Sequence, residues 1–330
     1  MSTYKFYSSI IGITLLYCAF SLKNANFKSL TSLAINNISD ADFKVETSYK
    51  MSAPISLNNV YDKVISGLEI DNSNVSCIQL TNCHDITIQD CRFVSSKGNG
   101  VNIYHCKNIT IKDCYMEKIA TGVYAVKSQG INVLYNQVKN VQGPYPRGQM
   151  VQFNEVNGDN NSVSYNKCEN IPGSSNAEDI INMFKTNGTL NSPVKIIGNW
   201  IRGGGPSASS GGIMLGDNGG SYIIADKNIL VNPGQYGIAI SSGTNIQITN
   251  NKIYSKSQRF TNVGLYVWNQ YHSSCALNIV SGNMINWTNS KGRKNHEWNK
   301  GNCGPVNGWK SNLTGAKIDS AILPLAIITK

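Results

Sequence analysis

The stretch CKNITIKDCYM (106–116) repeats CHDITIQDCRF (83–93), and the two copies begin 23 residues apart. Each copy contains an alternating strand-like segment, then Asp, then a further apolar pair. GTNIQITNNKI (243–253) and CALNIVSGNMI (275–285) follow the same order, with Asn or Gly in place of Asp. Alternation with a period of two predicts β-strands, and recurrence of such segments predicts a repeat protein.

A second short apolar element recurs at wider spacing. Its copies are GVNIY (100–104), GVYAV (122–126), MVQFN (150–154), DIINMF (179–184), GIMLG (212–216), GIAIS (237–241) and GLYVW (264–268). If Val101, Val123, Val151, Ile181, Ile213, Ile238 and Leu265 are equivalent, successive copies lie 22 to 32 residues apart. Such a repeat is typical of one coil of a parallel β-helix, whose stacked coils bury a shared core. We therefore predict an all-β chain, a right-handed parallel β-helix of about eight to ten coils.

The two ends of the chain differ from the repeats. An apolar run at 10–20 follows Lys5, which is typical of a secretory signal peptide and is shorter than the roughly 20 residues of a membrane span. We expect a signal peptide over 1–21, a cap segment over 22–59, the β-helix over 60–290 and a C-terminal cap over 291–330. The protein is then secreted, to the exterior or the periplasm, unless a lipid on Cys18 anchors it to a membrane.

The charge limits the class of partner. The formal net charge is +10, which attracts a polyanion. The lysines are dispersed, and the basic runs typical of nucleic-acid-binding arms are missing. We therefore expect an acidic polysaccharide as the partner, no nucleic acid, and a monomeric protein.

Cysteine recurs with the repeat. Cys83 and Cys91 are followed 23 residues later by Cys106 and Cys114, so each pair occupies equivalent positions of successive coils. These thiols either fill stacked positions as small apolar side chains or form disulfides, and the spacing leaves both possibilities open. Because the chain has no Cys-x-x-Cys motif, the cysteine spacing does not indicate a zinc site. We expect no essential metal and no cofactor.

Asparagine recurs in the same way. One column contains Asn136, Asn166, Asn199, Asn228, Asn251 and Asn283. Buried asparagines stacked at turns can satisfy backbone groups, so we interpret this column as structural. In the irregular C-terminal part, Cys275 and Cys303 are candidates for a disulfide.

Three insertions interrupt the central coils. They are QGPYPRG (142–148), ENIPGSSNA (169–177) and RGGGPSASS (202–210). Each precedes the short strand of the next coil, so we expect all three along one edge of one face. Long loops on a rigid scaffold often carry function, and this face is therefore the predicted site.

Two outward columns cross this face. One residue after the inward Val or Ile lie Asn102, Tyr124, Gln152, Asn182, Met214, Ala239 and Tyr266. Four residues after it lie His105, Lys127, Glu155, Lys185, Asp217, Ser242 and Asn269. This register places Lys185 between Glu155 and Asp217 of the neighbouring coils, unless an inserted residue shifts it by one. A stripe of amides, tyrosines, acids and a lysine suits a sugar chain.

The loop segments carry a family resemblance. They are GPYPRGQMVQF (143–153), AEDIINMFKTNGT (177–189), GNWIRGGGP (198–206), GGIMLGDNGGSY (211–222), NPGQYGIAI (232–240) and NVGLYVWN (262–269). Over about 60–290 the chain resembles secreted right-handed β-helix polysaccharide lyases, above all the alginate lyases of polysaccharide lyase family 31. EDIINMFK is also similar to family 6 in its acid-then-lysine order. The arginine–histidine pair of family 6 is missing, so its calcium site is not expected here.

The resemblance implies β-elimination on a uronate polymer, most of all alginate as polymannuronate. The catalytic residues that it implies are Lys185, Tyr145 and Arg147. The substrate-binding residues that we expect are Tyr124, Lys127, Gln149, Gln152, Glu178, Asp179, Asn182, Arg202, Asp217 and Tyr266. Tyr124 is the alternative to Tyr145 as the partner of Lys185, and both arginines are candidates to pair with the uronate carboxylate. Glu178 and Asp179 either hold the Lys185 ammonium or cap the turn before the strand.

Three other classes remain open. A C5-epimerase shares the proton abstraction but leaves the chain uncut, and a non-catalytic carbohydrate-binding β-helix would bind the polymer without turnover. A glycoside hydrolase needs two carboxyl groups facing each other across a cleft. Asp179 and Asp217 are available for that role, although the expected register puts a lysine between them.

Overall fold

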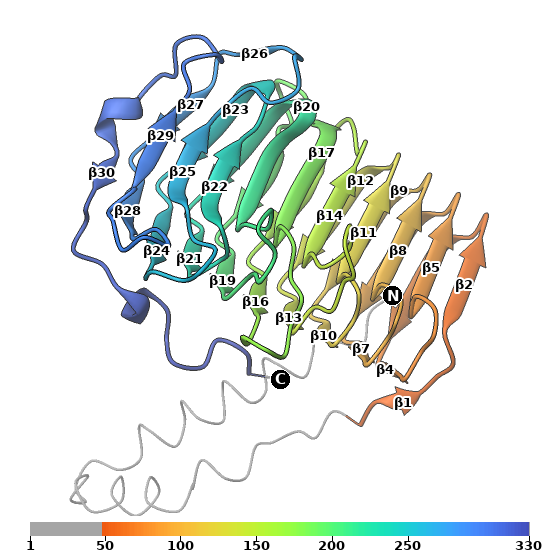
Figure 1. Cartoon of the computed structure of the whole chain (residues 1–330). Coiled ribbons are helices and arrows are strands. Elements are labelled where there is room, and N and C mark those ends of the chain that lie inside the picture. Colours follow the sequence, from red (N-terminus) through yellow and green to blue (C-terminus); the bar gives the residue numbers. More distant parts are fainter. Residues whose placement is uncertain (1–47, 330) are drawn as a thin grey trace, which may run out of the picture. The chain divides into compact units, whose positions relative to one another are not determined.

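The computed structural model describes residues 48–329, and these form a parallel β-helix (Figure 1). The expected signal peptide and Cys18 lie outside the described residues. Every pairing between the named strands is parallel, and each coil contributes a strand to each of three faces. The prediction of a right-handed parallel β-helix is confirmed. The helical elements among the described residues are the short 3₁₀-helices η1 (Trp309–Ser311) and η2 (Ser320–Ile322).

The first face contains the short apolar strands predicted from GVNIY (100–104) and its equivalents. Its strands are β2 (Ile55–Asn58), β5 (Ile78–Thr81), β8 (Val101–Tyr104), β11 (Val123–Val126), β14 (Val151–Asn154), β17 (Ile181–Asn187), β20 (Ile213–Asp226), β22 (Tyr236–Ile240), β25 (Val263–Val267) and β29 (Glu297–Asn299).

The second face joins the first through the long strand β20. Its other strands are β3 (Tyr61–Ser66), β6 (His84–Gln89), β9 (Lys107–Lys112), β12 (Gln129–Leu134), β15 (Ser162–Ser164), β18 (Val194–Ile197), β23 (Gly243–Thr249), β26 (Cys275–Ala276) and β27 (Ile279–Ser281).

The third face is an 11-stranded sheet. Its strands are β1 (Lys50–Met51), β4 (Leu68–Asp71), β7 (Arg92–Val94), β10 (Tyr115–Glu117), β13 (Gln137–Lys139), β16 (Lys167–Glu169), β19 (Trp200–Arg202), β21 (Ile229–Val231), β24 (Lys252–Ser255), β28 (Met284–Trp287) and β30 (Leu313–Thr314). Strand pairing thus begins before residue 60 and continues past residue 290.

The register on the first face confirms the predicted inward column. Val123 pairs with Val101 and Val151, and Ile181 pairs with Val151 and Ile213. These side chains are fully buried or nearly so, because each coil covers the inner face of its neighbour. The outward column is confirmed too, since Gln152 pairs with Tyr124 on one side and Asn182 on the other.

The predicted asparagine column forms a continuous ladder. Each side-chain amide donates to the side-chain oxygen of the next asparagine, from Asn136 through Asn283 to Asn312. Asn199 is representative, because its amide also donates to the Val163 carbonyl and its oxygen accepts from the Asn166 backbone N–H. The ladder therefore satisfies buried backbone groups at the corner between the second and third faces.

The cysteines separate into two groups. Cys83, Cys91, Cys106 and Cys114 are buried, and the Cys83 backbone N–H donates to the Cys106 sulfur at 3.3 Å. These four cysteines thus fill stacked positions as small apolar side chains and do not form disulfides with one another. Cys275 and Cys303 form a disulfide across the C-terminal coils.

Candidate active site

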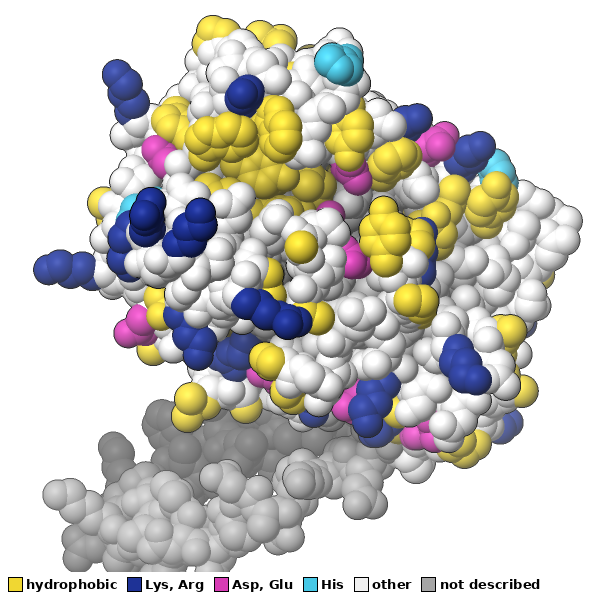
Figure 2. Space-filling view, in the orientation of Figure 1, with side chains coloured by type: hydrophobic (Ala, Val, Ile, Leu, Met, Phe, Trp, Pro, Cys, Tyr) yellow, Lys and Arg dark blue, Asp and Glu magenta, His cyan; other side chains and the backbone are white. Residues whose placement is uncertain are grey.

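A cavity of about 680 Å³ opens on the first face, over β14, β17, β20, β22 and β25. Tyr145 and Arg147 line it from the 142–148 insertion, and Ser209 lines it from the 202–210 insertion. In Figure 2, hydrophobic side chains gather over the β22 and β25 part of this face, with acidic side chains beside them. Two of the three insertions that the sequence marks therefore line this cavity.

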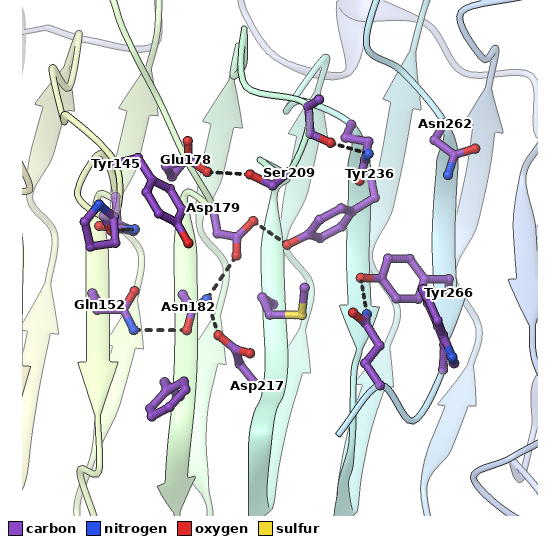
Figure 3. A pocket seen from close by; sticks show the side chains of 18 of the residues that line it. Tyr145, Gln152, Glu178, Asp179, Asn182, Ser209, Asp217, Tyr236, Asn262 and Tyr266 are labelled. Atoms are coloured by element: carbon purple, nitrogen blue, oxygen red, sulfur yellow. Dashed lines mark hydrogen bonds between the residues drawn. The ribbon is translucent and has the colours of Figure 1, made fainter. Parts of the chain in front are cut away.

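Asn182 lies between two carboxyl groups at the floor of the cavity (Figure 3). Its side-chain amide donates to Asp179 Oδ2 and to Asp217 Oδ2, each at 2.9 Å. The Asn182 oxygen accepts from Gln152 Nε2 at 3.0 Å. The amide orientation is thus fixed by three partners, and the two acids face each other across one nitrogen atom.

Asp179 precedes β17 and is held by three donors. Its Oδ1 accepts from the Gly211 backbone N–H at 2.9 Å and from the Tyr236 hydroxyl at 2.5 Å, in addition to the bond from Asn182. Burial raises the pKa of Asp179 to about 7, against the lowering effect of the Tyr236 and Asn182 hydrogen bonds. The negative charges of Asp217 and Glu178 raise it further. Asp179 therefore keeps its proton to a higher pH than an exposed carboxyl group does.

Gly211 makes room for the Tyr236 ring. A Cβ atom at residue 211 would lie 2.2 Å from the nearest ring atom of Tyr236, so only glycine lets this ring reach Asp179. Burial and the neighbouring Asp179 charge raise the pKa of the Tyr236 hydroxyl well above its ordinary value. Tyr236 therefore stays protonated and acts as a donor.

A β-bulge turns Asp217 into the cavity. Asn182 pairs with Met214, but Phe184 pairs with Asp217, so β20 carries one extra residue between these pairs. Gly216, at φ 64°, allows the bulge, because a Cβ there would lie 1.9 Å from the Ser242 carbonyl oxygen. The expectation that Asp217 stands beside Lys185 is wrong for this reason. Asp217 instead accepts from Asn182 and, at 2.6 Å, from the Tyr271 hydroxyl.

Aromatic rings form one wall of the cavity. Tyr236 and Tyr266 meet edge to face at 5.2 Å between ring centroids, and Trp298 packs against both Tyr266 and Trp268. The outward column predicts Tyr266, and Trp268 lies two residues later, directly after the end of β25. The sequence-based predictions do not include Tyr236, Trp268, Tyr271 and Trp298. Extending the outward column by two residues would have found Trp268.

Most of the sequence-predicted residues meet at this cavity. Those that line it are Tyr145, Arg147, Gln149, Gln152, Glu178, Asp179, Asn182, Asp217 and Tyr266. Gln149 is buried, accepts from Thr121 and donates to the Pro146 carbonyl, so it fixes the 142–148 insertion.

Four of the predicted residues lie outside the lining. Lys185 is exposed at a corner of the coil, with its ammonium 5.4 Å from the Phe184 ring centroid. Lys127 borders a separate cavity of about 380 Å³. Arg202 pairs with Glu169 and donates to backbone carbonyls near the C-terminus, including that of Pro324.

Tyr124 is the fourth, and it lies beneath Arg147. The Arg147 guanidinium stands 3.9 Å from the Tyr124 ring centroid, and one of its nitrogens, Nη1, is buried without a hydrogen-bond partner among residues 48–329. Because Arg147 also lines the cavity, its guanidinium is a candidate partner for an anionic ligand there.

The proposed acid clamp on Lys185 is not formed. Glu178 accepts from the Ser209 hydroxyl, and Asp179 accepts from Gly211, Tyr236 and Asn182. Both acids therefore belong to the cavity and have partners other than the ammonium.

Among residues 48–329, no group of three or more His, Cys, Asp and Glu side chains is arranged to hold a metal ion. Within the same range, no helix is long and apolar enough to cross a membrane.

Comparisons with known proteins agree with the fold. A family model described as "Right handed beta helix region" matches residues 53–177. No curated protein matches the chain. Among solved structures, the chain is similar to PfbA, a surface adhesin of Streptococcus pneumoniae, at 13% identity and TM-score 0.43, covering 71% of this chain and 59% of that one. The chain thus spans less than two thirds of that protein.

A second similar structure is the catalytic domain of a GH87 α-1,3-glucanase in complex with nigerose. It shares 12% identity at TM-score 0.34, covering 81% of this chain and 69% of that one. Another structure of such a domain, in complex with tetrasaccharides, has 12% identity, TM-score 0.35 and coverages of 80% and 63%. At these identities the likeness concerns the fold alone.

Proposed function

We propose that this protein is a secreted, polysaccharide-cleaving enzyme in which Asp179 protonates the leaving glycosidic oxygen. The observation that carries the proposal is a carboxyl group with a pKa of about 7, facing a second carboxyl group in an aromatic-walled cavity. A proton donor works best when its pKa lies near the working pH. The aromatic wall offers faces on which sugar rings stack.

Hydrolysis is the reaction that this geometry favours most. Asp179 Oδ2 and Asp217 Oδ2 lie 2.9 Å from the same nitrogen, so they are separated by no more than twice that distance. Retaining glycosidases place their carboxyl groups about 5 Å apart, whereas inverting enzymes need roughly 6.5 Å or more for a water molecule. Asp217 is then the nucleophile that attacks the anomeric carbon, and Asp179 is the acid and later the base.

Asn182, and not Lys185, lies between the two carboxyl groups, which removes the argument against hydrolysis. The register expected from the sequence put Lys185 between the two acids, and an ammonium there would keep Asp179 ionised. The bulge at Gly216 places a neutral amide between them instead. The amide orients both carboxyl groups and leaves the pKa of Asp179 high.

β-Elimination on a uronate polymer is the second candidate, and Arg147 favours it. Its guanidinium lines the cavity and is suited to bind the uronate carboxylate, which lowers the pKa of the neighbouring C–H. One of the tyrosines that line the cavity, for example Tyr145, then removes that proton, and Asp179 protonates the leaving oxygen. In this mechanism Lys185 keeps its proposed role only if its flexible side chain reaches over Phe184 into the cavity.

Product analysis separates these mechanisms. The mature protein is incubated with alginate fractions, chondroitin sulfate and neutral glucans, alongside Asp179→Asn. New reducing ends without ultraviolet absorbance from unsaturated uronate indicate hydrolysis, and both signals together indicate β-elimination. The absence of both signals on every polymer would overturn the proposal. In that case, a change in uronate composition by NMR would indicate the epimerase, and binding alone would indicate a carbohydrate-binding protein.

A further inference from the structure

The cavity of the candidate active site has a charge opposite to that of the whole chain. Among the described residues, the charged groups of its lining are three acids and one base, namely Glu178, Asp179, Asp217 and Arg147. Within residues 48–329 none of the three acids forms an ion pair, and the donors that bond to them are neutral. The lining therefore has a net negative charge even when Asp179 is protonated, although the formal net charge of the chain is +10.

The other cations that the sequence analysis expected at this site lie elsewhere. Lys127 and Lys185 are outside the lining, and Arg202 belongs to β19 on the third face. Arg147 is at the end of the cavity nearest the N-terminal coils, where its guanidinium packs on the Tyr124 ring of β11. A uronate polymer has a carboxylate on every residue, so most of its carboxylates would meet acids or uncharged groups in this cavity.

The outward column changes from polar to apolar across the cavity. Asn182 pairs with Met214, and the column continues through Ala239 and Tyr266 to Trp298 of β29. Neighbouring strands lie roughly 4.8 Å apart, so the four steps from Asn182 to Trp298 span about 19 Å. More than one sugar residue of a bound chain is needed to bridge that distance.

Two tryptophans form the far end of the cavity. Trp298 and Trp268 line it, are 41% and 39% exposed, and meet at 5.7 Å between ring centroids with their planes at 72°. Trp298 also packs against Tyr266, whose hydroxyl accepts from Gln270 Nε2 at 3.1 Å. Asn262 adds a second amide to the same lining (Figure 3). Rings together with amides suit a sugar residue, which has an apolar C–H face and a rim of hydroxyl groups.

We propose that the cavity takes a neutral glycan, one of whose sugar residues binds against Trp268 and Trp298, away from the acid pair. This inference rests on the proposed function, because the cavity is the one assigned there to cleavage. The tryptophans then contribute to affinity along the chain, and Asp179 and Asp217 act only at the bond that lies between them. The acidic lining excludes polyanions, which the positive surface of the protein would otherwise attract.

Two variants test the aromatic end without altering the acids. Trp298→Ala and Trp268→Ala each remove one ring of the pair. Tyr104→Ala is the matched control, since Tyr104 is a ring of the first face that is 40% exposed, meets His105 edge to face, and lies outside the cavity lining. Thermal unfolding of each variant checks that it is folded.

Isothermal titration calorimetry in the Asp179→Asn background measures binding to soluble β-glucan, α-glucan, xylan and mannan, and to polymannuronate, polyguluronate and chondroitin sulfate. We expect one of the neutral polymers to bind, about three- to tenfold more weakly in both tryptophan variants and equally in the control. Its affinity should change little between low and high salt, because the ligand has no charge to screen. In the active protein, both tryptophan variants should raise KM for this polymer and keep kcat within a few fold.

The outcomes for the ligand and for catalysis are separate. A polyanion that binds more tightly than every neutral polymer, and loses affinity in the tryptophan variants, would overturn the inference. So would a lack of binding to all neutral polymers, or binding that neither tryptophan variant weakens. Tryptophan-dependent binding of a neutral polymer that the wild-type protein does not cleave would support the inference and overturn only the proposed cleavage.

Discussion

The Tyr236 hydroxyl donates a 2.5 Å hydrogen bond to Asp179, although the two residues are 57 positions apart and lie on coils separated by one other coil. The bond lowers the pKa of Asp179, and burial raises it by more, to about 7. This pair therefore sets the pH range over which the carboxyl group carries a proton. The proposed chemistry depends on that range.

Asp179→Asn should abolish most of the activity. A positioned proton donor contributes roughly a hundredfold or more to the rate, and an amide cannot supply the proton. The measurement is kcat on whichever polymer is cleaved, with circular dichroism to confirm folding. Glu178→Gln is the control, because Glu178 is bonded to Ser209 rather than to Asn182 and should retain activity within a few fold. Full activity in Asp179→Asn would exclude Asp179 as the donor.

The pH profile should respond to Tyr236→Phe in a defined direction. Asp179 must be protonated to act as the acid, so activity in the wild-type protein should fall as pH rises through about 7. The lost hydrogen bond stabilised the ionised carboxylate, so the variant should have a higher Asp179 pKa and an alkaline limb displaced to higher pH. A limb that moves to lower pH, or not at all, would argue against this assignment.

Lys185→Ala and Arg147→Ala together distinguish the two candidate reactions. Under hydrolysis of a neutral glycan, both variants should keep kcat within a few fold. Under β-elimination, Arg147→Ala should lose at least about tenfold in kcat/KM, because the uronate carboxylate loses its partner. A hundredfold loss in Lys185→Ala would restore the sequence-based hypothesis that Lys185 is catalytic.

The asparagine ladder should matter to stability rather than to activity. Asn199→Ala removes the side-chain donor to the Val163 carbonyl and one of the two donors to the Asn228 oxygen, and it leaves Asn166 without its acceptor. We expect a loss of about 3 kcal/mol in the free energy of unfolding. Urea denaturation measures it, with the exposed Asn191→Ala as the control. An unchanged denaturation midpoint would show that the ladder is dispensable.

The sequence predicts the fold in detail because period and spacing are local properties. The inward column from Val101 to Leu265 and the outward pairing of Gln152 with Asn182 need only an alternating strand and a fixed repeat. The asparagine column follows from the same spacing. Cys275 and Cys303, the disulfide candidates of the irregular C-terminal part, do form a disulfide. The insertions also predict correctly which face is hollowed.

The contacts that Asp179 and Asp217 make in the site are harder to predict from the sequence. The extra residue at Gly216 exchanges Lys185 for Asn182 as the neighbour of Asp217, and nothing in GGIMLGDNGG marks the bulge in advance. Tyr236 and Tyr271 reach the acids from other coils, and their direction depends on packing, such as the space left by Gly211. Alternation alone cannot supply such orientations.

The bulge at Gly216 also bears on how such a site can arise. The bulge decides whether Asp217 points into the cavity or stands at the outer corner, as Lys185 and Glu155 do. The buried column of Ile181, Ile213 and Ile238 keeps its register where β20 begins. A substitution at residue 216 could therefore create or erase the acid pair while the stack beneath it stays intact.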